Sequence, residues 1–186
     1  MKLSVCMILG KCDEKLSDTL YSINQIADEI CLLQTVDHQP TTDIVTDFAA
    51  DIDCDMKFEC NESLMHEDGF LKSFADARNE SFAMATGDMI LWIDADDVLS
   101  DAAGLRETIE HMDNKGVDMI RMDYDYEFDK SGQCTTRHRR ERVVRRGYFE
   151  WIAPIHEVLN PMRRANVAEL ERDTCYVIHN NIRGDD

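Results

Sequence analysis

Residues 89–99 read MILWIDADDVL, a run of mostly apolar residues that ends in three aspartates. The apolar run has the length and composition of a buried β-strand, and Asp94, Asp96 and Asp97 follow at its carboxyl end. Two carboxylates about 4 Å apart repel each other by several kcal/mol at the effective dielectric of a protein surface. Folding the three together is costly unless a cation offsets their charge. The stretch therefore predicts a strand that ends in a cation-binding loop.

The chain around this stretch alternates between apolar blocks of strand length and segments of helical period. Such alternation is typical of βαβ units and of a largely parallel sheet. Gly87 and Gly116 stand where helix stop signals are expected, and Ser100 stands where an N-cap is expected. The expected strands are residues 3–9, 29–35, 56–60 and 89–94, and the expected helices are residues 14–27, 42–50, 70–85 and 101–114.

From residue 117 the helical period gives way to the alternation of a β-strand. Residues 117–128, VDMIRMDYDYEF, alternate in polarity, DKSGQ is a turn sequence, and CTTRHRRERVVRR can return as an antiparallel partner. The second half thus predicts a mixed-sheet extension of the first. Because no internal repeat, low-complexity segment or Pro/Gly-rich linker interrupts the sequence, we expect one domain over residues 1–186.

Composition restricts the class of protein. The 186 residues are 44% hydrophobic and 31% charged, which is typical of a soluble globular domain, and the net charge of −18 argues against binding DNA by phosphate neutralisation. Seven cysteines without a C-x-x-C pair favour a reducing cytoplasm over a disulfide framework. The apolar start is too short for a signal peptide, and no later run is long enough to span a bilayer.

The aspartate cluster has one functional and one structural interpretation. Asp94 and Asp96 lie two apart in an extended chain and face the same way, while Asp97 turns with the loop. In open α/β sheets ligands bind outside the carboxyl ends of the strands, and such oxygen ligands suit Mg²⁺ or Mn²⁺ with a phosphate-bearing molecule. The alternative is that the aspartates only turn the chain and cap the next helix, but capping needs a single carboxylate.

Two other motifs overlap the cluster. DADDV fits the D-x-D-x-[TV] pattern of haloacid-dehalogenase-type phosphatases, with Asp94 as nucleophile and Asp96 as general acid. That pattern also needs an early strand, a later lysine and a later acidic pair, whereas 89 residues with two lysines follow and the late pair is residues 185–186. An EF-hand is excluded because its fifth and twelfth positions would be Val98 and Leu105.

Residues 74–99, FADARNESFAMATGDMILWIDADDVL, resemble the central block of family 2 glycosyltransferases with the GT-A fold. In that family an Ala-Arg-Asn helix and an ATGD turn lead into the strand of the D-x-D motif. Residues 8–23, ILGKCDEKLSDTLYSI, are similar to its opening strand and helix. RVVRRGYFEWIAPIHEVL resembles the arginine-rich strand and W-x-x-x-x-HE block of a bacterial subgroup, and CYVIHN resembles its last strand. The blocks occur in the family's order along nearly the whole chain.

The resemblance implies a fold and an activity. The fold would be a GT-A type α/β domain with a mixed, mostly parallel central sheet flanked by helices. Residues 1–97 would bind the nucleotide sugar, and residues 98–186 would face the acceptor. The activity would be transfer of a sugar from a nucleotide diphosphate, a UDP-sugar first of all, to a hydroxyl-bearing acceptor such as a glycan or protein, with nucleic acid still open. It would depend on Mn²⁺ or Mg²⁺ and would invert the configuration of the sugar's anomeric carbon.

The family's binding roles pass to matching residues of this chain. Glu14 would lie near the nucleobase, and Arg78 near the base or the diphosphate. The D-x-D motif, Asp94, Ala95 and Asp96, would hold the ribose and the metal, and Asp96, Asp97 and His179 would complete the metal site.

The catalytic roles fall on the W-x-x-x-x-HE block. Glu157 would be the general base that takes the acceptor's proton, and His156 would orient the base or the acceptor. A single carboxylate acting as base gives one in-line displacement, which inverts the anomeric carbon. A metal and a cationic side chain would stabilise the leaving diphosphate.

The residues expected to recognise the nucleobase depart from the family pattern. Residues 32–45, LLQTVDHQPTTDIV, place Gln34 where the family has an acidic residue that contacts the uracil. The acidic role would then pass to Asp37 or Asp43.

The basic run RHRRERVVRR, residues 137–146, has two interpretations. It is either a solvated edge strand that charge protects from aggregation, or a clamp for the diphosphate or a phosphate-bearing acceptor. In a strand only one parity can face a cleft. Arg139 and Arg140 are the acceptor candidates, with Trp151 as a stacking surface or a cleft wall.

Two rival functions remain at this point. One is the phosphatase, and the other is a nucleotide-sugar-binding module without turnover. Such a module would keep the aspartates in use but would be indifferent to Glu157.

Overall fold

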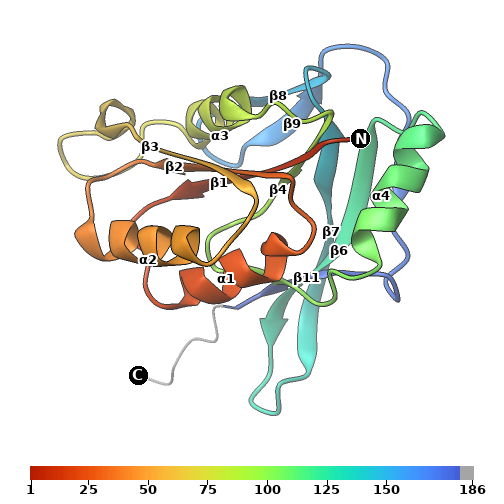
Figure 1. Cartoon of the computed structure of the whole chain (residues 1–186), viewed down its shortest axis with the longest axis horizontal. Helices are drawn as coiled ribbons and strands as arrows, with labels where there is room; N and C mark the ends of the chain where they lie inside the picture. Colours follow the sequence, from red (N-terminus) through yellow and green to blue (C-terminus); the bar gives the residue numbers. More distant parts are fainter. Residues whose placement is uncertain (181–186) are drawn as a thin grey trace.

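A mixed β-sheet runs through the centre of the molecule (Figure 1). The computed structural model describes residues 1–180, so the acidic pair at residues 185–186 lies outside the described residues. Within that range the strand order is β3-β2-β1-β4-β7-β6-β11-β5, and β10 pairs with β6. The strands are β1 (Leu3–Leu9), β2 (Glu29–Gln34), β3 (Asp55–Cys60), β4 (Met89–Trp92), β5 (Asp97–Leu99), β6 (Met119–Phe128), β7 (Cys134–Arg145), β10 (Val167–Glu169) and β11 (Val177–His179).

The parallel half of the sheet confirms the βαβ expectation. Strands β1, β2, β3 and β4 pair in parallel, because helices carry the chain back between them. In Figure 1 α1 and α2 lie on one side of these strands and α3 on the other, beside the two-stranded sheet of β8 (Phe149–Ile152) and β9 (Val158–Pro161). The helices are α1 (Lys15–Asn24), α2 (Gln39–Ala50), α3 (Phe74–Met84) and α4 (Leu105–Asn114), with a 3₁₀ turn at Glu62–Leu64.

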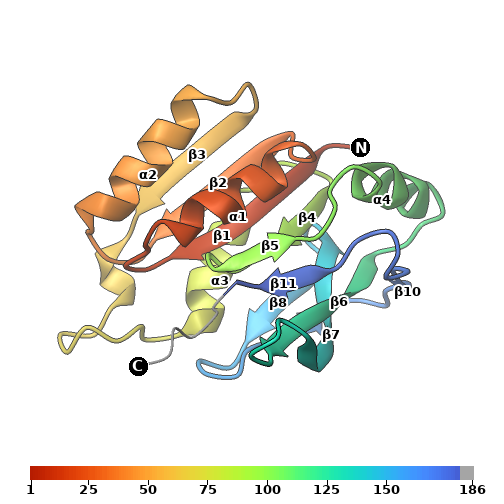
Figure 2. The ribbon, with the colours of Figure 1, turned by 90° about the horizontal axis from the view of Figure 1, so that it is seen from below.

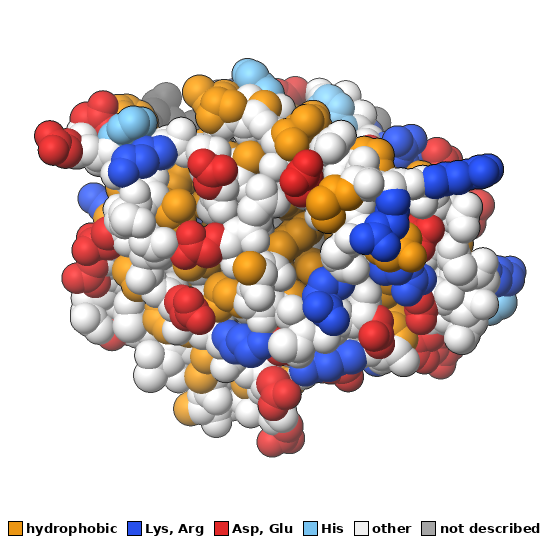
Figure 3. Space-filling model, turned by 90° about the horizontal axis from the view of Figure 1, so that it is seen from above, with side chains coloured by type: hydrophobic (Ala, Val, Ile, Leu, Met, Phe, Trp, Pro, Cys, Tyr) orange, Lys and Arg blue, Asp and Glu red, His pale blue; other side chains and the backbone are white. Residues whose placement is uncertain are grey.

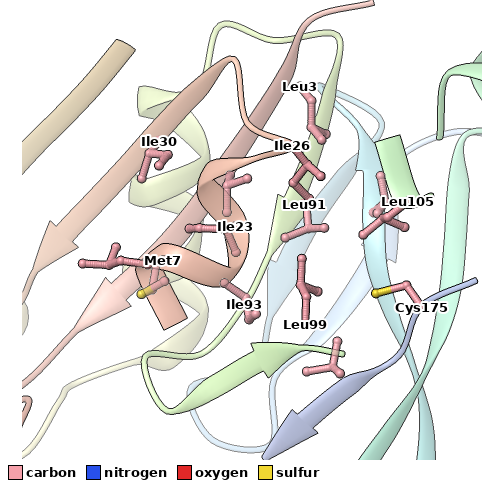
Figure 4. Close-up of a cluster of buried hydrophobic side chains, with 14 of the residues drawn as sticks. Leu3, Met7, Ile23, Ile26, Ile30, Leu91, Ile93, Leu99, Leu105 and Cys175 are labelled. Carbon is pink, nitrogen blue, oxygen red and sulfur yellow. The ribbon is translucent and has the colours of Figure 1, made fainter. Parts of the chain in front are cut away.

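The central strands are buried on both faces, as expected of parallel strands between helices. On β1, Val5 and Met7 join the larger core with α1 and α4, while Cys6 joins a second core under α3. Figure 4 shows the larger core, in which Ile23 of α1, Leu91 of β4 and Leu105 of α4 come together. None of the helices in residues 1–180 has the length and hydropathy to span a bilayer.

The antiparallel half also confirms the expected extension. Strands β6 and β7 form a long hairpin, and β7 pairs antiparallel with β4. Figure 2 shows β11 lying between β5 and β6. The register of the hairpin shifts by one residue near its base, where Ile120 faces Val143 but Arg121 faces Glu141. Arg142 is the extra residue of this β-bulge, a feature that alternation in the sequence does not reveal.

Two helix starts were predicted too early. The helix expected from residue 70 begins at Phe74, because Ser73 caps it by accepting a hydrogen bond from the Asp76 N–H (3.1 Å). The helix expected from residue 101 begins at Leu105, because the Ser100 hydroxyl accepts from the N–H of Tyr176 (3.0 Å) instead of capping. Ser73 is a local N-cap signal within the sequence, whereas the contact of Ser100 with Tyr176 lies outside the local sequence pattern.

Smaller differences affect four other elements. The first helix ends at residue 24 instead of 27, and the second begins at residue 39, with Pro40 in its first turn. The strand expected to reach residue 94 ends at Trp92, and residues 97–99, expected as loop, form β5 against β11.

A buried carboxylate ties together the amino-terminal ends of the parallel strands. Glu29 is 1% exposed and accepts hydrogen bonds from the Ser4 hydroxyl (2.5 Å) and from the N–H and hydroxyl of Thr86 (both 2.8 Å). Its third partner is the Lys57 ammonium at 2.8 Å. Burial alone would raise the pKa of Glu29, but these donors hold it well below its ordinary value. Gly87 lies against this network.

Replacing Gly87 with alanine should destabilise the fold. A Cβ at residue 87 would lie 2.6 Å from the Ser4 Oγ and 2.8 Å from the carbonyl oxygen of Lys2, so backbone must shift. We expect Gly87→Ala to lower the free energy of unfolding by about 1–3 kcal/mol in urea denaturation. Gly10→Ala is the matched control, because nothing lies within 4 Å of its added Cβ. Equal stability of the two variants would contradict the packing argument.

Candidate active site

The centre of the site is a guanidinium shared by two carboxylates from distant parts of the chain. Arg78 of α3 donates from Nη2 to Asp94 Oδ1 (2.6 Å) and from Nε to Glu157 Oε1 (2.9 Å). It is 7% exposed and lies over the rings of Trp92 (4.6 Å) and Trp151 (5.0 Å). The sequence-predicted residues Arg78, Asp94 and Glu157 are therefore in direct contact.

Cations hold Asp94 in its charged form. Burial alone would raise the pKa of its carboxyl group, but Arg78 and Arg142 hold that pKa below its ordinary value. Asp94 is ionised at neutral pH as a result. Arg142 Nη1 lies 3.7 Å from Asp94 Oδ2, so a guanidinium faces each carboxylate oxygen.

Asp97 lies in a second network beneath the first. It is fully buried, and its Oδ2 accepts from Arg142 Nη2 at 2.8 Å. Its Oδ1 accepts from the Tyr124 hydroxyl (3.0 Å) and lies 3.0 Å from His179 Nδ1. The resemblance expected Asp97 among the metal ligands, and the structure shows both of its oxygens already in contact with protein groups.

Arg142 is a residue of the site that sequence reasoning missed. It is 1% exposed, and its guanidinium lies between the rings of Trp92 (4.1 Å) and Tyr124 (4.6 Å). The sequence placed it only within the basic run. At the bulge in β7 its guanidinium reaches Asp94 and Asp97, where it offsets their charge.

Asp96 and His179 lie where a divalent cation could bind. With Asp97, each offers one ligand atom, and these atoms lie within 4.8 Å of one another. The Asp96 side chain is 41% exposed, and its partial burial raises the pKa of the carboxyl group. His179 packs against the ring of Tyr126 at 5.1 Å. The carboxylate of Asp96 suits Mn²⁺ or Mg²⁺ with several bound waters, and the imidazole of His179 suits the transition metal Mn²⁺ better than Mg²⁺, so the donor set fits a divalent cation.

His179 Nδ1 lies 3.0 Å from Asp97 Oδ1 and 3.8 Å from Asp96 Oδ2. In the neutral tautomer that carries its proton on Nδ1, His179 donates to Asp97 Oδ1 across the 3.0 Å contact, and Nε2 keeps its lone pair. The same contact raises the pKa of His179 above its ordinary value.

Two pockets meet at Arg78 and share Phe74 as a second lining residue. The first, of about 460 Å³, lies at the carboxyl ends of β1 and β2 and reaches Asp94. The second, of about 470 Å³, lies between α3, β7 and the β8–β9 sheet and reaches Glu157. Figure 3 shows the face that carries α3, β8 and β9, where hydrophobic side chains gather around a hollow. The remaining lining of the second pocket is Arg140, Glu141, Trp151, Ile155, His156, Val158 and Leu159.

The loop before Glu157 has an unusual backbone. Ala153 (φ 73°) and His156 (φ 56°) both adopt the left-handed conformation, which is costly for residues with a Cβ. The carbonyl of Pro154 accepts from the N–H of Phe74 (2.9 Å), which fixes this loop against the start of α3. The loop and α3 together place Glu157 beside Arg78.

Asn79 is a further residue that sequence reasoning did not assign. Its side-chain amide donates to the carbonyl of Trp151 (2.9 Å) and accepts from the N–H of the same residue (2.8 Å). This paired contact joins α3 to β8. Trp151 is 3% exposed and packs edge-on against Trp92 at 4.9 Å, which makes it a wall of the second pocket.

Several predicted nucleotide-binding residues line neither of these two pockets. Gln34 is buried and bound within the protein, donating to the carbonyl of Val36 (2.7 Å). Glu14 and Asp43 are exposed, with Asp43 bound to Gln39 on α2. Ala95 contributes its carbonyl, which accepts from the Thr19 hydroxyl (2.9 Å) and fixes the aspartate loop to α1.

The two arginines expected to contact the acceptor lie in different surroundings. Arg140 lines the second pocket, whereas Arg139 binds Asp123 (2.7 Å) and Glu169 on the other face of β7. Only part of the basic run therefore lines the second pocket, and the bulge interrupts its alternation.

Comparison with known families gives a match along most of the chain. The profile described as Glycosyl transferase family 2 matches residues 4–176. A curated TPR repeat-containing protein of Synechococcus elongatus is 35% identical over 98 residues, which cover 53% of this chain and 21% of that protein. The chain thus spans about a fifth of the length of this curated relative.

Solved structures share the fold at low sequence identity. S. aureus TarS (residues 1–349) in complex with UDP-GlcNAc is 17% identical with a TM-score of 0.54, over 70% of this chain and 36% of that one. The mannosyltransferase PcManGT of Pyrobaculum calidifontis, in complex with GDP-Man and Mn²⁺, is 16% identical with a TM-score of 0.52, over 65% and 35%.

Removing the buried cation Arg142 should destabilise the protein strongly. In Arg142→Met the carboxylate of Asp97 loses its buried cationic partner, and we expect a loss of about 3–5 kcal/mol in the free energy of unfolding, measured in urea. Arg145→Met is the control, because Arg145 is also ion-paired on β7 but its side chain is 22% exposed, and we expect a loss of about 1 kcal/mol. A small effect at residue 142 would show that the aspartates do not depend on it.

Proposed function

The chain belongs to glycosyl transferase family 2, and from this membership we propose that it transfers a sugar from a nucleotide diphosphate to a hydroxyl acceptor. The observation that carries the proposal is the position of Arg78, which contacts Asp94 at the first pocket and Glu157 at the second. A donor in the first pocket and an acceptor in the second would meet at this guanidinium. The fold is of the GT-A type, as in its structural neighbours.

The first pocket is the proposed donor site. Its wall at Gly10, Thr35 and Val36 lies at the carboxyl ends of parallel strands, where nucleotides bind in open α/β sheets. TarS carries UDP-GlcNAc on this fold and PcManGT carries GDP-Man, which supports a nucleotide-sugar donor. A UDP-sugar is the first choice.

The residues that would hold the metal are Asp96 and His179. Because both oxygens of Asp97 contact other protein groups, we assign it the role of orienting His179 through Nδ1. Mn²⁺ or Mg²⁺ bound there would supply positive charge to the leaving diphosphate. The Mn²⁺ complex of PcManGT supports this assignment.

Glu157 is the proposed general base. Its Oε1 accepts from Arg78, and no group among residues 1–180 donates a hydrogen bond to its Oε2, which leaves that oxygen for an acceptor hydroxyl. Glu157 takes the hydroxyl proton while the acceptor oxygen bonds to the anomeric carbon. The bond from that carbon to the phosphate oxygen breaks, and the nucleoside diphosphate leaves. A single displacement inverts the configuration of the anomeric carbon.

Asp94 does not suit the nucleophilic role that a phosphatase would require. Its two oxygens face Arg78 and Arg142, and both cations lower its nucleophilicity by stabilising the negative charge.

Donor binding should depend on a divalent metal and on Asp96. We expect calorimetric titration of UDP with Mn²⁺ to show binding that a chelator removes, and Asp96→Ala to weaken it by about tenfold or more. Asp53→Ala, an exposed aspartate beside β3, is the control. Undiminished Mn²⁺-dependent affinity in Asp96→Ala would overturn the metal assignment.

Transfer should depend on Glu157, whereas donor binding should not. Glu157→Gln keeps an oxygen for Arg78 but cannot take a proton, so we expect UDP affinity to persist. The rate of UDP release from UDP-N-acetylglucosamine, with a mixture of monosaccharide acceptors, should fall about 10²–10⁴-fold.

Glu150→Gln is the control for this variant, since Glu150 is an exposed glutamate on β8. An active Glu157→Gln variant would place the base elsewhere. A wild-type protein that binds UDP without any turnover would favour a binding module.

A further inference from the structure

Arg140 differs from its neighbours in the basic run. Within residues 1–180 no carboxylate forms an ion pair with Arg140, and no hydrogen bond from its guanidinium is present. Each of the others has a partner: Arg137 binds Asp125, Arg139 binds Asp123, Arg142 binds Asp97, Arg145 binds Asp118, and Arg146 donates to the carbonyl of Gly87. The arginines of β7 are thus used for structure, with Arg140 as the exception in the described part of the chain.

Arg140 lies in the second pocket together with the proposed base Glu157. Its guanidinium lies 5.6 Å from the centre of the Trp92 ring, on the side of β7 opposite to the ion pairs of Arg139. A charged group held at this position would be close to the reacting hydroxyl of an acceptor.

The carboxylates of the second pocket already have cationic partners. Glu157 binds Arg78 at 2.9 Å, and Glu141 binds Arg121 at 3.2 Å. Asp94, at the adjoining pocket, is paired with Arg78 and faces Arg142. The positive charge of Arg140 is therefore available to a ligand, in a chain whose net charge of −18 otherwise repels anions.

The rim of the same pocket is apolar. Phe74 (40%), Ile155 (67%) and Val158 (54%) are all exposed to solvent there. Exposed apolar side chains around a charged centre suit a ligand that has non-polar faces as well as an anionic group, as an acidic or phosphorylated sugar does.

We propose that the second pocket selects an acceptor that carries a phosphate or carboxylate group beside its reacting hydroxyl, and that Arg140 binds this anion. A guanidinium pairs with either group through two parallel hydrogen bonds. The proposal rests on the proposed function, because it takes the second pocket as the acceptor site.

Three glucose compounds test the proposal: glucose, glucose 6-phosphate and glucuronate, which differ only in the anionic group. Each is titrated by ligand-observed NMR into the protein saturated with UDP and Mg²⁺. We expect the wild-type protein to bind both anionic sugars about tenfold more tightly than glucose. Arg140→Gln should lose that preference, and Arg140→Lys should keep part of it.

Arg139→Gln is the matched control. It removes the same charge one residue away, on the face that the structure places outside the pocket, and should keep the wild-type preference. Thermal melting confirms that each variant is folded. Binding of UDP is measured in parallel for every variant, so that loss of the donor site is distinguished from loss of acceptor selection.

Three outcomes would overturn the proposal. The first is equal binding of the three sugars by the wild-type protein. The second is equal loss of preference in Arg139→Gln and Arg140→Gln, which would indicate a general charge effect. The third is a matching loss of UDP affinity in Arg140→Gln, which would assign the residue to the donor. A preference for only one of the two anionic sugars that depends on Arg140 supports the proposal and identifies the anion.

Discussion

The arrangement of the site depends on the balance of charge around Asp94 and Asp97. The half-buried carboxylate of Asp94 and the fully buried one of Asp97 are stable three residues apart because two guanidinium groups, Arg78 and Arg142, lie beside them. The aromatic rings of Trp92, Trp151 and Tyr124 line the space that these guanidinium groups occupy. The charge of the aspartates in MILWIDADDVL is thus offset largely by arginines of the protein itself. Asp96 is the aspartate left for an outside cation.

The fold brings these groups together from separate parts of the chain. The segment between the end of β4 and the start of β5 carries the aspartates, α3 carries Arg78, and β7 carries Arg142 at its bulge. The loop before Glu157 reaches the same point because α3 holds β8 through Asn79. Each of these groups is therefore held in place by another part of the protein. The donor and acceptor sides of the proposed reaction are built on one sheet.

Local sequence patterns predicted what depends on periodicity. The apolar run before Asp94 predicted the central strand, and alternation predicted that only part of the basic run would face the cleft. The patterns could not predict what depends on tertiary contacts. A one-residue bulge shifted the register of β7 at Arg142, Ser100 bound Tyr176 instead of capping a helix, and the Gln34 side chain donated to the carbonyl of Val36. The contact of Arg78 with Glu157 joins residues 79 positions apart and has no local signature.

The shared position of Arg78 limits how a site of this kind can diversify. A substitution at Arg78 changes both pockets at once, so a new specificity on one side would disturb the other. A residue that lines a single pocket can change without altering the other pocket. Such residues include Val36 and Met65 in the first pocket and Arg140 and Ile155 in the second. Variation among related chains should therefore concentrate at the outer walls of the two pockets, while the residue at their junction stays fixed.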